Sequence, residues 1–234
     1  MNILRKTDIG IIGAMKIEVE AICAAMTDTE CEVISGMEFV SGTLKGKRVV
    51  CAKCGIGKVF AAMCAQTMLL RYAPAVVINS GVAGTLSPDL SIGQIALAEQ
   101  MVQHDMDTSP IGDPLGLISG INLVELPCDQ ALCEKIANCA GALGYRTMTG
   151  IVASGDQFVA DIEKKQWIAK TFGAIDCEME GAAIVQTCYQ SGVPCGVIRS
   201  ISDSLTGNGM DFEAFKHLAA SHSTAVVKAL LEAL

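Results

Sequence analysis

Acidic residues follow several apolar runs of this chain, at positions where folding would bury them. Glu178 and Glu180 lie two residues apart, where an apolar run gives way to small residues. Asp203 ends a second apolar run, and Glu18 follows an early one, Ile9 to Met15. A buried carboxyl group is costly unless it has a partner or a task, and proton transfer in a pocket is such a task. The pattern therefore indicates one pocket that gathers these acids.

The segments that must position these acids predict an α/β fold. Short β-branched runs bounded by glycine alternate with longer segments of helical period, which is typical of helices packed around a central sheet. The predicted strands are Ile9 to Gly13, Arg48 to Cys54, Ala75 to Ser80, Gln94 to Glu99, Met148 to Ala153 and Cys195 to Ile201. The predicted helices are Lys16 to Met26, Lys58 to Tyr72, Asp129 to Leu143, Ile162 to Thr171, Met179 to Ser191 and Phe212 to Leu234.

Two further features complete the expected architecture. Residues 32–44 alternate and turn like an antiparallel hairpin, so we expect a mixed sheet. The sequence contains no repeat and no long charged or Pro/Ser-rich linker, and its 234 residues fit a single domain, residues 1–234, better than two small ones.

Composition favours a small-molecule ligand. About half of the residues are hydrophobic (51%), which is enough for a full core, and the formal charge is -8. No cluster of Lys and Arg offers the basic surface that phosphate backbones require, so nucleic acid is not an expected partner.

The cysteines and the N-terminus predict a soluble cytoplasmic protein. Eleven cysteines are an odd number in a long chain, and many lie in apolar segments, which is typical of buried thiols in a reducing compartment. The first apolar stretch meets Lys16, Glu18 and Glu20 too soon for a signal peptide or a membrane span, and no membrane partner is expected.

Several familiar sequence motifs are matched only in part. Cys51 and Cys54 match a redox spacing, but residues three apart on a strand point to opposite faces. Gly55-Ile-Gly57-Lys58 lacks the length and hydroxyl residue of a phosphate-binding loop, and Gly10-Ile-Ile-Gly13 is not a full dinucleotide fingerprint. The three histidines lack metal-ligand spacing, and no Gly-x-Ser-x-Gly elbow occurs. The sequence predicts no metal and no cofactor.

Seven motifs, taken together, occur in the order and spacing of one family. They are Gly13-Ala-Met-Lys-Ile-Glu18-Val19, Gly55-Ile-Gly57-Lys58-Val59, Asn79-Ser-Gly-Val-Ala-Gly84, His104-Asp-Met-Asp107, Ala153-Ser-Gly-Asp-Gln-Phe158, Cys177-Glu-Met-Glu180 and Arg199-Ser-Ile-Ser-Asp203. From about Asp8 to the final helix, the chain resembles the 5'-methylthioadenosine/S-adenosylhomocysteine nucleosidases. Each motif alone is weak, whereas seven in register are highly specific.

The resemblance implies a fold, an activity and an assembly. The expected fold is a single α/β domain with a central mixed β-sheet flanked by helices, like that of the nucleoside phosphorylases, and the expected assembly is a homodimer. The expected reaction is hydrolysis of the N-glycosidic bond of 5'-methylthioadenosine and S-adenosylhomocysteine, with 5'-deoxyadenosine as a further candidate. The products are adenine and the 5'-substituted ribose, and the associated pathway is methionine salvage.

The resemblance also assigns the proton-transfer residues. Asp203 matches the general acid that protonates adenine N7, and burial would help its carboxyl to stay protonated. Ser202 beside it is expected to orient that carboxyl. Glu18 matches the residue that activates water, and Arg199 is expected to hold the Glu18 carboxylate ionised. Without the resemblance, Asp203 would be a turn cap and Glu18 a solvated residue on a helix like Glu20.

The remaining matched residues are expected to contact the nucleoside. Glu180 corresponds to the carboxylate that accepts hydrogen bonds from the ribose hydroxyls, with Met179 against the sugar. The Phe158 ring is expected to stack on adenine, and the Val159 backbone to contact the adenine edge. The apolar wall around the 5' substituent is expected to consist of Met15, Ile56 and Phe212. Glu178 is expected to have a structural role.

Two departures from the family pattern bear on activity. Val82 stands where the family commonly has a hydroxyl residue, which helps the related phosphorylases to bind phosphate. The segment 107–116 lacks the aromatic residues that often cover the sugar in the family, and by composition the wider segment 105–120 is either a surface connection or a loop over a site. A phosphate-dependent purine nucleoside phosphorylase of the same fold and a non-catalytic nucleoside-binding protein remain as alternatives.

Overall fold

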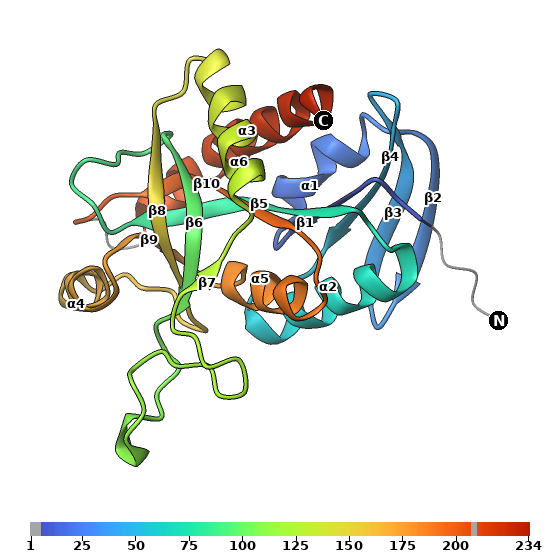
Figure 1. The fold of residues 1–234 in the computed structure, drawn as a ribbon. Coiled ribbons are helices and arrows are strands. Elements are labelled where there is room, and N and C mark those ends of the chain that lie inside the picture. Colours follow the sequence, from blue (N-terminus) through green and yellow to red (C-terminus); the bar gives the residue numbers. More distant parts are fainter. Residues whose placement is uncertain (1–5, 207–209) are drawn as a thin grey trace.

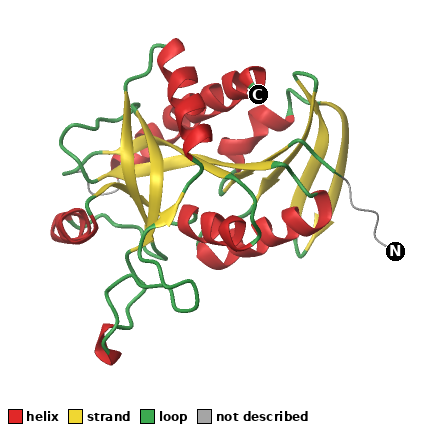
Figure 2. Ribbon diagram, in the orientation of Figure 1, coloured by secondary structure: helices red, strands yellow, loops and turns green. Residues whose placement is uncertain are grey.

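A computed structural model describes residues 6–206 and 210–234 of the chain. Its centre is a mixed sheet with helices on both sides (Figures 1 and 2). The strands are β1 (Ile9–Gly13), β2 (Thr27–Ile34), β3 (Met37–Leu44), β4 (Lys47–Lys53), β5 (Val76–Thr85), β6 (Ile95–Gln103), β7 (Leu126–Pro127), β8 (Thr147–Ser154), β9 (Ala174–Glu178) and β10 (Cys195–Asp203). The helices are α1 (Lys16–Cys23), α2 (Lys58–Tyr72), α3 (Gln130–Ala142), α4 (Ile162–Phe172), α5 (Gly181–Gln190) and α6 (Met210–Ala233), with a short 3₁₀ turn, η1 (Ser109–Ile111).

The strand order closes part of the sheet into a ring. Strands β5, β9, β8, β6 and β10 pair in turn, and β10 pairs with β5 again. From β5 the sheet continues through β1 and β4 to the hairpin of β3 and β2. Strands β1, β5 and β10 are parallel neighbours, so their carboxyl ends meet at the same edge of the sheet. That edge is where an open α/β sheet forms its ligand crevice.

Two apolar layers hold the helices against the sheet. Helices α2 and α5 pack together on one side, and α1, α3 and α6 lie on the other (Figure 1). Strands between such layers are buried on both faces, and every residue of β1 and β10 is buried. Burial on both faces explains why these strands read as continuous apolar runs in the sequence.

The predicted fold class is confirmed, and so are the six predicted strands, the six predicted helices and the hairpin. Two short strands, β7 and β9, were not predicted. In β9 the buried acid Asp176 interrupts the apolar run, which hides the strand pattern. The predicted helix from Met179 was wrong at its start, because β9 runs to Glu178 and α5 begins at Gly181.

The segment 105–120 is a connection that projects from the body of the protein and contains η1 (Figure 1). Within the described ranges, 6–206 and 210–234, no helix is long and apolar enough to cross a membrane.

Candidate active site

One cavity of about 300 Å³ opens at the carboxyl ends of β1, β5 and β10. All of the predicted site residues except Arg199 line it: Met15, Glu18, Ile56, Phe158, Val159, Met179, Glu180, Ser202, Asp203 and Phe212. Residues from most of the chain length therefore meet in one place. Of the part of the chain that the structure describes, no residue of 105–120 lines this cavity, so that segment does not cover it within one chain.

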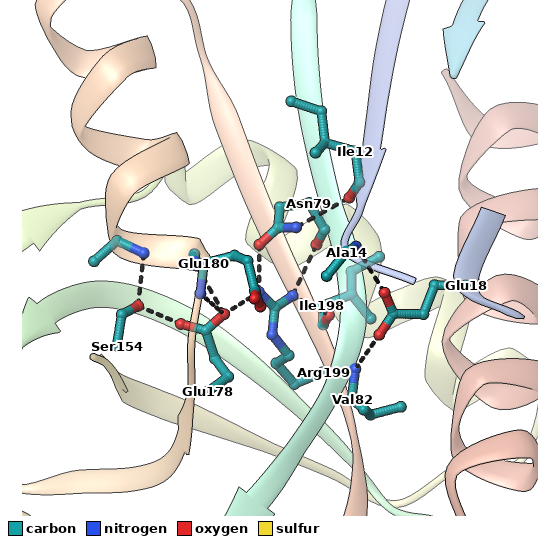
Figure 3. A network of polar contacts seen from close by, with 12 residues as sticks. Ile12, Ala14, Glu18, Asn79, Val82, Ser154, Glu178, Glu180, Ile198 and Arg199 are labelled. Carbon is teal, nitrogen blue, oxygen red and sulfur yellow. Dashed lines mark hydrogen bonds and ion pairs between the residues drawn. The ribbon is translucent and has the colours of Figure 1, made fainter. Parts of the chain in front are cut away.

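Glu18 is held in place by backbone N–H groups. It is the third residue of α1, and its Oε2 accepts hydrogen bonds from the N–H groups of Ala14 (2.7 Å) and Met15 (2.8 Å). Its Oε1 accepts one from the N–H of Val82 on β5 (3.2 Å) (Figure 3). Burial raises the pKa of Glu18, while these hydrogen bonds and the charge of Arg199 oppose the rise. The carboxyl group is thus oriented and is poised to accept a proton.

Arg199 lies deep in the protein, and its direct partner among the acids is Glu178. Its Nη2 donates to Glu178 Oε2 (2.5 Å) and to the side-chain oxygen of Asn79, and its Nη1 donates to the Ile198 carbonyl oxygen (2.9 Å) (Figure 3). No hydrogen bond joins Arg199 to Glu18 among the described contacts. Its charge lowers the pKa of Glu18 through space only. The sequence placed Arg199 in the right region but could not show that Glu178 is its direct partner.

Glu178 is occupied by structural contacts. Its Oε2 accepts hydrogen bonds from the N–H groups of Glu180 (3.0 Å) and Gly181 (2.7 Å), at the start of α5, in addition to the bond from Arg199. Its Oε1 accepts a hydrogen bond from the Ser154 hydroxyl. Although burial opposes it, the Arg199 charge and these hydrogen bonds lower the pKa of Glu178. Glu178 therefore anchors Arg199 and α5 and is not free to bind a ligand.

Glu180 lines the cavity as a buried carboxyl group with a raised pKa. Its Oε1 accepts a hydrogen bond from the N–H of Gly57 (2.8 Å), which has a φ of 100° and begins α2. Burial and the neighbouring Glu178 raise the pKa of Glu180 to about 8. The Glu180 carboxyl group can accept further hydrogen bonds, and it faces a cavity that is large enough for a ligand. This suits recognition of hydroxyl groups.

The raised pKa of Glu180 predicts a stability that falls with pH. The folded state keeps this proton between the ordinary pKa of 4.5 and about 8, whereas the unfolded state loses it. The unfolding free energy is therefore expected to decrease by a few kcal/mol as pH rises through that window, with no contribution from Glu180 below it. Urea unfolding of the protein and of Glu180→Gln at pH 5 and pH 8.5 measures this. The variant is expected to show a smaller decrease, and parallel decreases would contradict the prediction.

Asp203 is buried at the end of β10 between three groups. The Ser202 hydroxyl donates to its Oδ1 (3.1 Å), and the Lys165 ammonium donates to its Oδ2 (3.2 Å). Gly84 on β5 makes room for the carboxyl, because a Cβ added there would lie 2.5 Å from Oδ2. Lys165 was not predicted. It follows Lys164 on a helix, and nothing in the local sequence separates a buried lysine from an exposed one.

Aromatic and apolar side chains form the rest of the wall. The rings of Phe158 and Phe212 meet edge to face with centroids 5.4 Å apart, and the Val159 side chain is buried behind them. Phe158 and Ile56 are 51% and 56% exposed, so both lie at the mouth of the cavity. An apolar mouth and an acidic interior suit a ligand with a flat ring, a hydroxylated centre and an apolar arm.

Part of the mixed sheet closes into a ring, and acids and aromatic side chains lie together at one edge of it. This arrangement is typical of nucleoside-binding enzymes that act on the bond between base and sugar. The family model described as "Phosphorylase superfamily" matches residues 8–232. The 5'-methylthioadenosine/S-adenosylhomocysteine nucleosidase of Shewanella loihica is 39% identical over 229 residues, which cover 97% of this chain and 99% of that protein. The chain therefore belongs to the phosphorylase superfamily and, within it, to the 5'-methylthioadenosine/S-adenosylhomocysteine nucleosidase family.

Solved structures agree with this assignment. A nucleosidase of the same name from Neisseria meningitidis, in complex with methylthio-immucillin-A, superimposes with a TM-score of 0.94 at 32% identity and covers 97% of this chain and 100% of its own. The futalosine hydrolase of Helicobacter pylori superimposes with a TM-score of 0.93 at 35% identity, covering 97% of this chain and 98% of its own. The resemblance found in the sequence is confirmed.

Proposed function

We propose that the protein hydrolyses the N-glycosidic bond of 5'-methylthioadenosine and S-adenosylhomocysteine and releases adenine and the 5'-substituted ribose. The observation that carries the proposal is the placement of two acids over one strand. A Cβ at Gly81 would lie 3.0 Å from Glu18 Oε1, and one at Gly84 would lie 2.5 Å from Asp203 Oδ2. Both acids line the same cavity of about 300 Å³, which leaves room for a sugar and a water between an acid and a base.

In this proposal Asp203 and Glu18 transfer different protons. Asp203 gives a proton to adenine N7, so that the base leaves as a neutral molecule. Glu18 takes a proton from the water that attacks the sugar carbon. Glu180 accepts hydrogen bonds from the ribose hydroxyls, with Met179 against the sugar, and Phe158 stacks on the purine beside the Val159 backbone. The 5' substituent lies against Met15, Ile56 and Phe212.

The charges in the cavity favour water over phosphate as the nucleophile. Glu18, Glu178 and Glu180 gather around one guanidinium, that of Arg199, whose terminal nitrogens already donate to protein oxygens. The raised pKa of Glu180 removes its charge near neutral pH, but the carboxyl groups of Glu18 and Glu178 and a guanidinium already paired with protein oxygens still disfavour a phosphate dianion. Val82 offers only its backbone N–H, and that group donates to Glu18.

Adenine release from 5'-methylthioadenosine in phosphate-free buffer, with the sugar product identified, tests the proposal. Free methylthioribose with and without added phosphate supports a nucleosidase. A phosphate requirement with a sugar 1-phosphate product would identify a phosphorylase, and binding without turnover would identify a nucleoside-binding protein. S-adenosylhomocysteine and 5'-deoxyadenosine in the same assay rank the 5' substituents.

We further propose a cytoplasmic enzyme of methionine salvage. All eleven cysteines of this chain are unpaired and most are buried, which suits a reducing compartment. Salvage follows from the substrate, because adenine and a thio-sugar are the recyclable parts of methylthioadenosine.

We also propose that the protein forms a homodimer through α2. Val59, Phe60, Met63 and Leu70 recur at helical spacing on this helix and are 69%, 51%, 41% and 69% exposed. An exposed apolar stripe of this kind marks an interface, and most soluble oligomers are symmetric homodimers.

In sedimentation velocity, the double variant V59E/M63E is expected to shift the protein from dimer to monomer. Val33→Glu, at an equally exposed position on β2, is the control and should leave the dimer intact. A monomeric parent protein would refute the proposal.

A further inference from the structure

A lysine lies buried against the acid that the reaction requires. Lys165 projects inward from α4, and its side chain is 0% exposed. Its Nζ lies 3.2 Å from Asp203 Oδ2 and 2.7 Å from the carbonyl oxygen of Ser204. A buried ammonium is costly without such partners, so these two contacts are part of the folded protein.

The other groups that face Asp203 do not replace this cation. Ser202 donates a neutral hydroxyl to Oδ1, and β9 contributes Asp176 and Cys177. Burial raises the pKa of Asp176 and of Cys177, which disfavours a negative charge on either side chain. Asp211 of α6 accepts hydrogen bonds from the N–H and hydroxyl of Ser204, and these lower its pKa. Lys165 therefore supplies the positive charge next to the carboxyl of Asp203.

We propose that Lys165 is a positioning residue that fixes the Asp203 carboxyl at the base end of the cavity and stabilises the carboxylate that forms as the proton passes to the leaving purine. The inference rests on the proposed function. A carboxyl group in an apolar environment holds its proton too tightly to be a good donor, and an adjacent ammonium opposes that effect. After the transfer, the proton is on purine N7 and the Asp203 carboxylate is paired with Lys165. The ammonium itself neither gains nor loses a proton.

The helix explains how this lysine reaches the site. Asp161 caps α4 by accepting a hydrogen bond from the N–H of Lys164 (2.8 Å). Lys165, Ile168 and Phe172 then share the buried face of the helix, while the Lys164 ammonium lies 4.0 Å from the ring centroid of Trp167. The two neighbouring lysines therefore have different environments, and Lys170 in the last turn is exposed. Lys170 provides a control on the same helix.

The test compares Lys165→Met, Lys165→Arg and Lys170→Met in the pH dependence of kcat/KM for adenine release. Removing the cation is expected to lower kcat roughly 10-fold or more with little change in KM, because the contacts to purine and ribose remain. It is also expected to move the basic limb of the profile to higher pH by about one unit or more, because an adjacent cation favours the ionised form of a carboxyl group. Lys165→Arg retains a cation and should keep the wild-type limb, as should Lys170→Met.

The outcomes separate the two proposals. If the wild-type protein releases no adenine, the proposed function fails before any variant is compared. If it does release adenine but the basic limb of Lys165→Met coincides with that of the wild type, the inference about Lys165 is overturned. A lower melting temperature with an unchanged pH profile would then show a structural role. If Lys165→Met does not fold, the Lys165→Arg profile decides: a shifted limb with a retained cation overturns the inference, and an unchanged limb with retained kcat supports it.

Discussion

Replacing Asp203 by Asn is expected to lower kcat for adenine release by roughly 10²-fold or more, while most of the affinity for a nucleoside is retained. The amide has the shape of the carboxyl group. Its oxygen can still accept the hydrogen bond from Lys165, while its NH₂ group faces the Ser202 hydroxyl, which can accept. It cannot transfer a proton to N7, so adenine must leave as an anion. Steady-state adenine release measures the rate, and calorimetric titration with a slowly cleaved nucleoside analogue measures the binding.

A second buried acid provides the control for this experiment. Asp176 lies on β9, which pairs with β5 next to β10. It is fully buried and has no hydrogen-bond partner for its carboxyl oxygens within the described residues. Burial raises its pKa well above the ordinary value, and Asn has the same size as the Asp side chain. The variant Asp176→Asn is expected to keep most of the rate. Wild-type rates in Asp203→Asn would refute its assignment as the acid.

The fold was predictable where the local pattern and the tertiary structure agree. Helix α2 begins and ends at the predicted residues, Lys58 and Tyr72, because Gly57 precedes a regular helical period. Strands β1 and β10 are buried on both faces and were recognised as continuous apolar runs. Strand β9 was missed because Asp176 is buried by neighbours that lie far away in the sequence, and no local pattern shows that.

The same distinction applies to the site. Six of the seven motifs supply residues to the cavity, whereas His104-Asp-Met-Asp107 does not. The motifs did not predict pairings across elements. Arg199 on β10 pairs with Glu178 on β9, and Lys165 on α4 pairs with Asp203 on β10. Such pairs depend on side chains from distant segments, and a lysine on a helix has the same sequence pattern whether it faces solvent or an acid.

The arrangement of charges suits a reaction in which the sugar becomes positive. Glu18 and Glu180 line the cavity, and Glu178 neutralises the adjacent Arg199. The interaction of Arg199 with these three acids raises its pKa, so the guanidinium remains charged. A ribose ring that gains positive charge as the base departs would therefore be stabilised by ionised carboxylates in the cavity wall.

Glu18→Gln is the second variant for which we expect a large loss, roughly 10² to 10⁴-fold in kcat. The amide keeps the size of the side chain but cannot accept a proton from water. It also replaces an acceptor of three backbone hydrogen bonds, from Ala14, Met15 and Val82, by a group whose NH₂ end would face an N–H donor. Adenine release under saturating substrate measures the effect, and a retained rate would contradict the role of Glu18 as the base.

Glu20→Gln is the matched control, because Glu20 lies one position beyond Ile17-Glu18-Val19 on the same helix and faces solvent. Its side chain is 52% exposed and pairs only loosely with Lys16, at 3.8 Å. An exposed ion pair of this kind contributes little to stability, so the variant should fold and turn over like the parent protein. If Glu20→Gln lost activity and Glu18→Gln retained it, the base would lie on the solvent face of α1. The backbone N–H groups that hold Glu18 would then have a purely structural role, as the cap of α1.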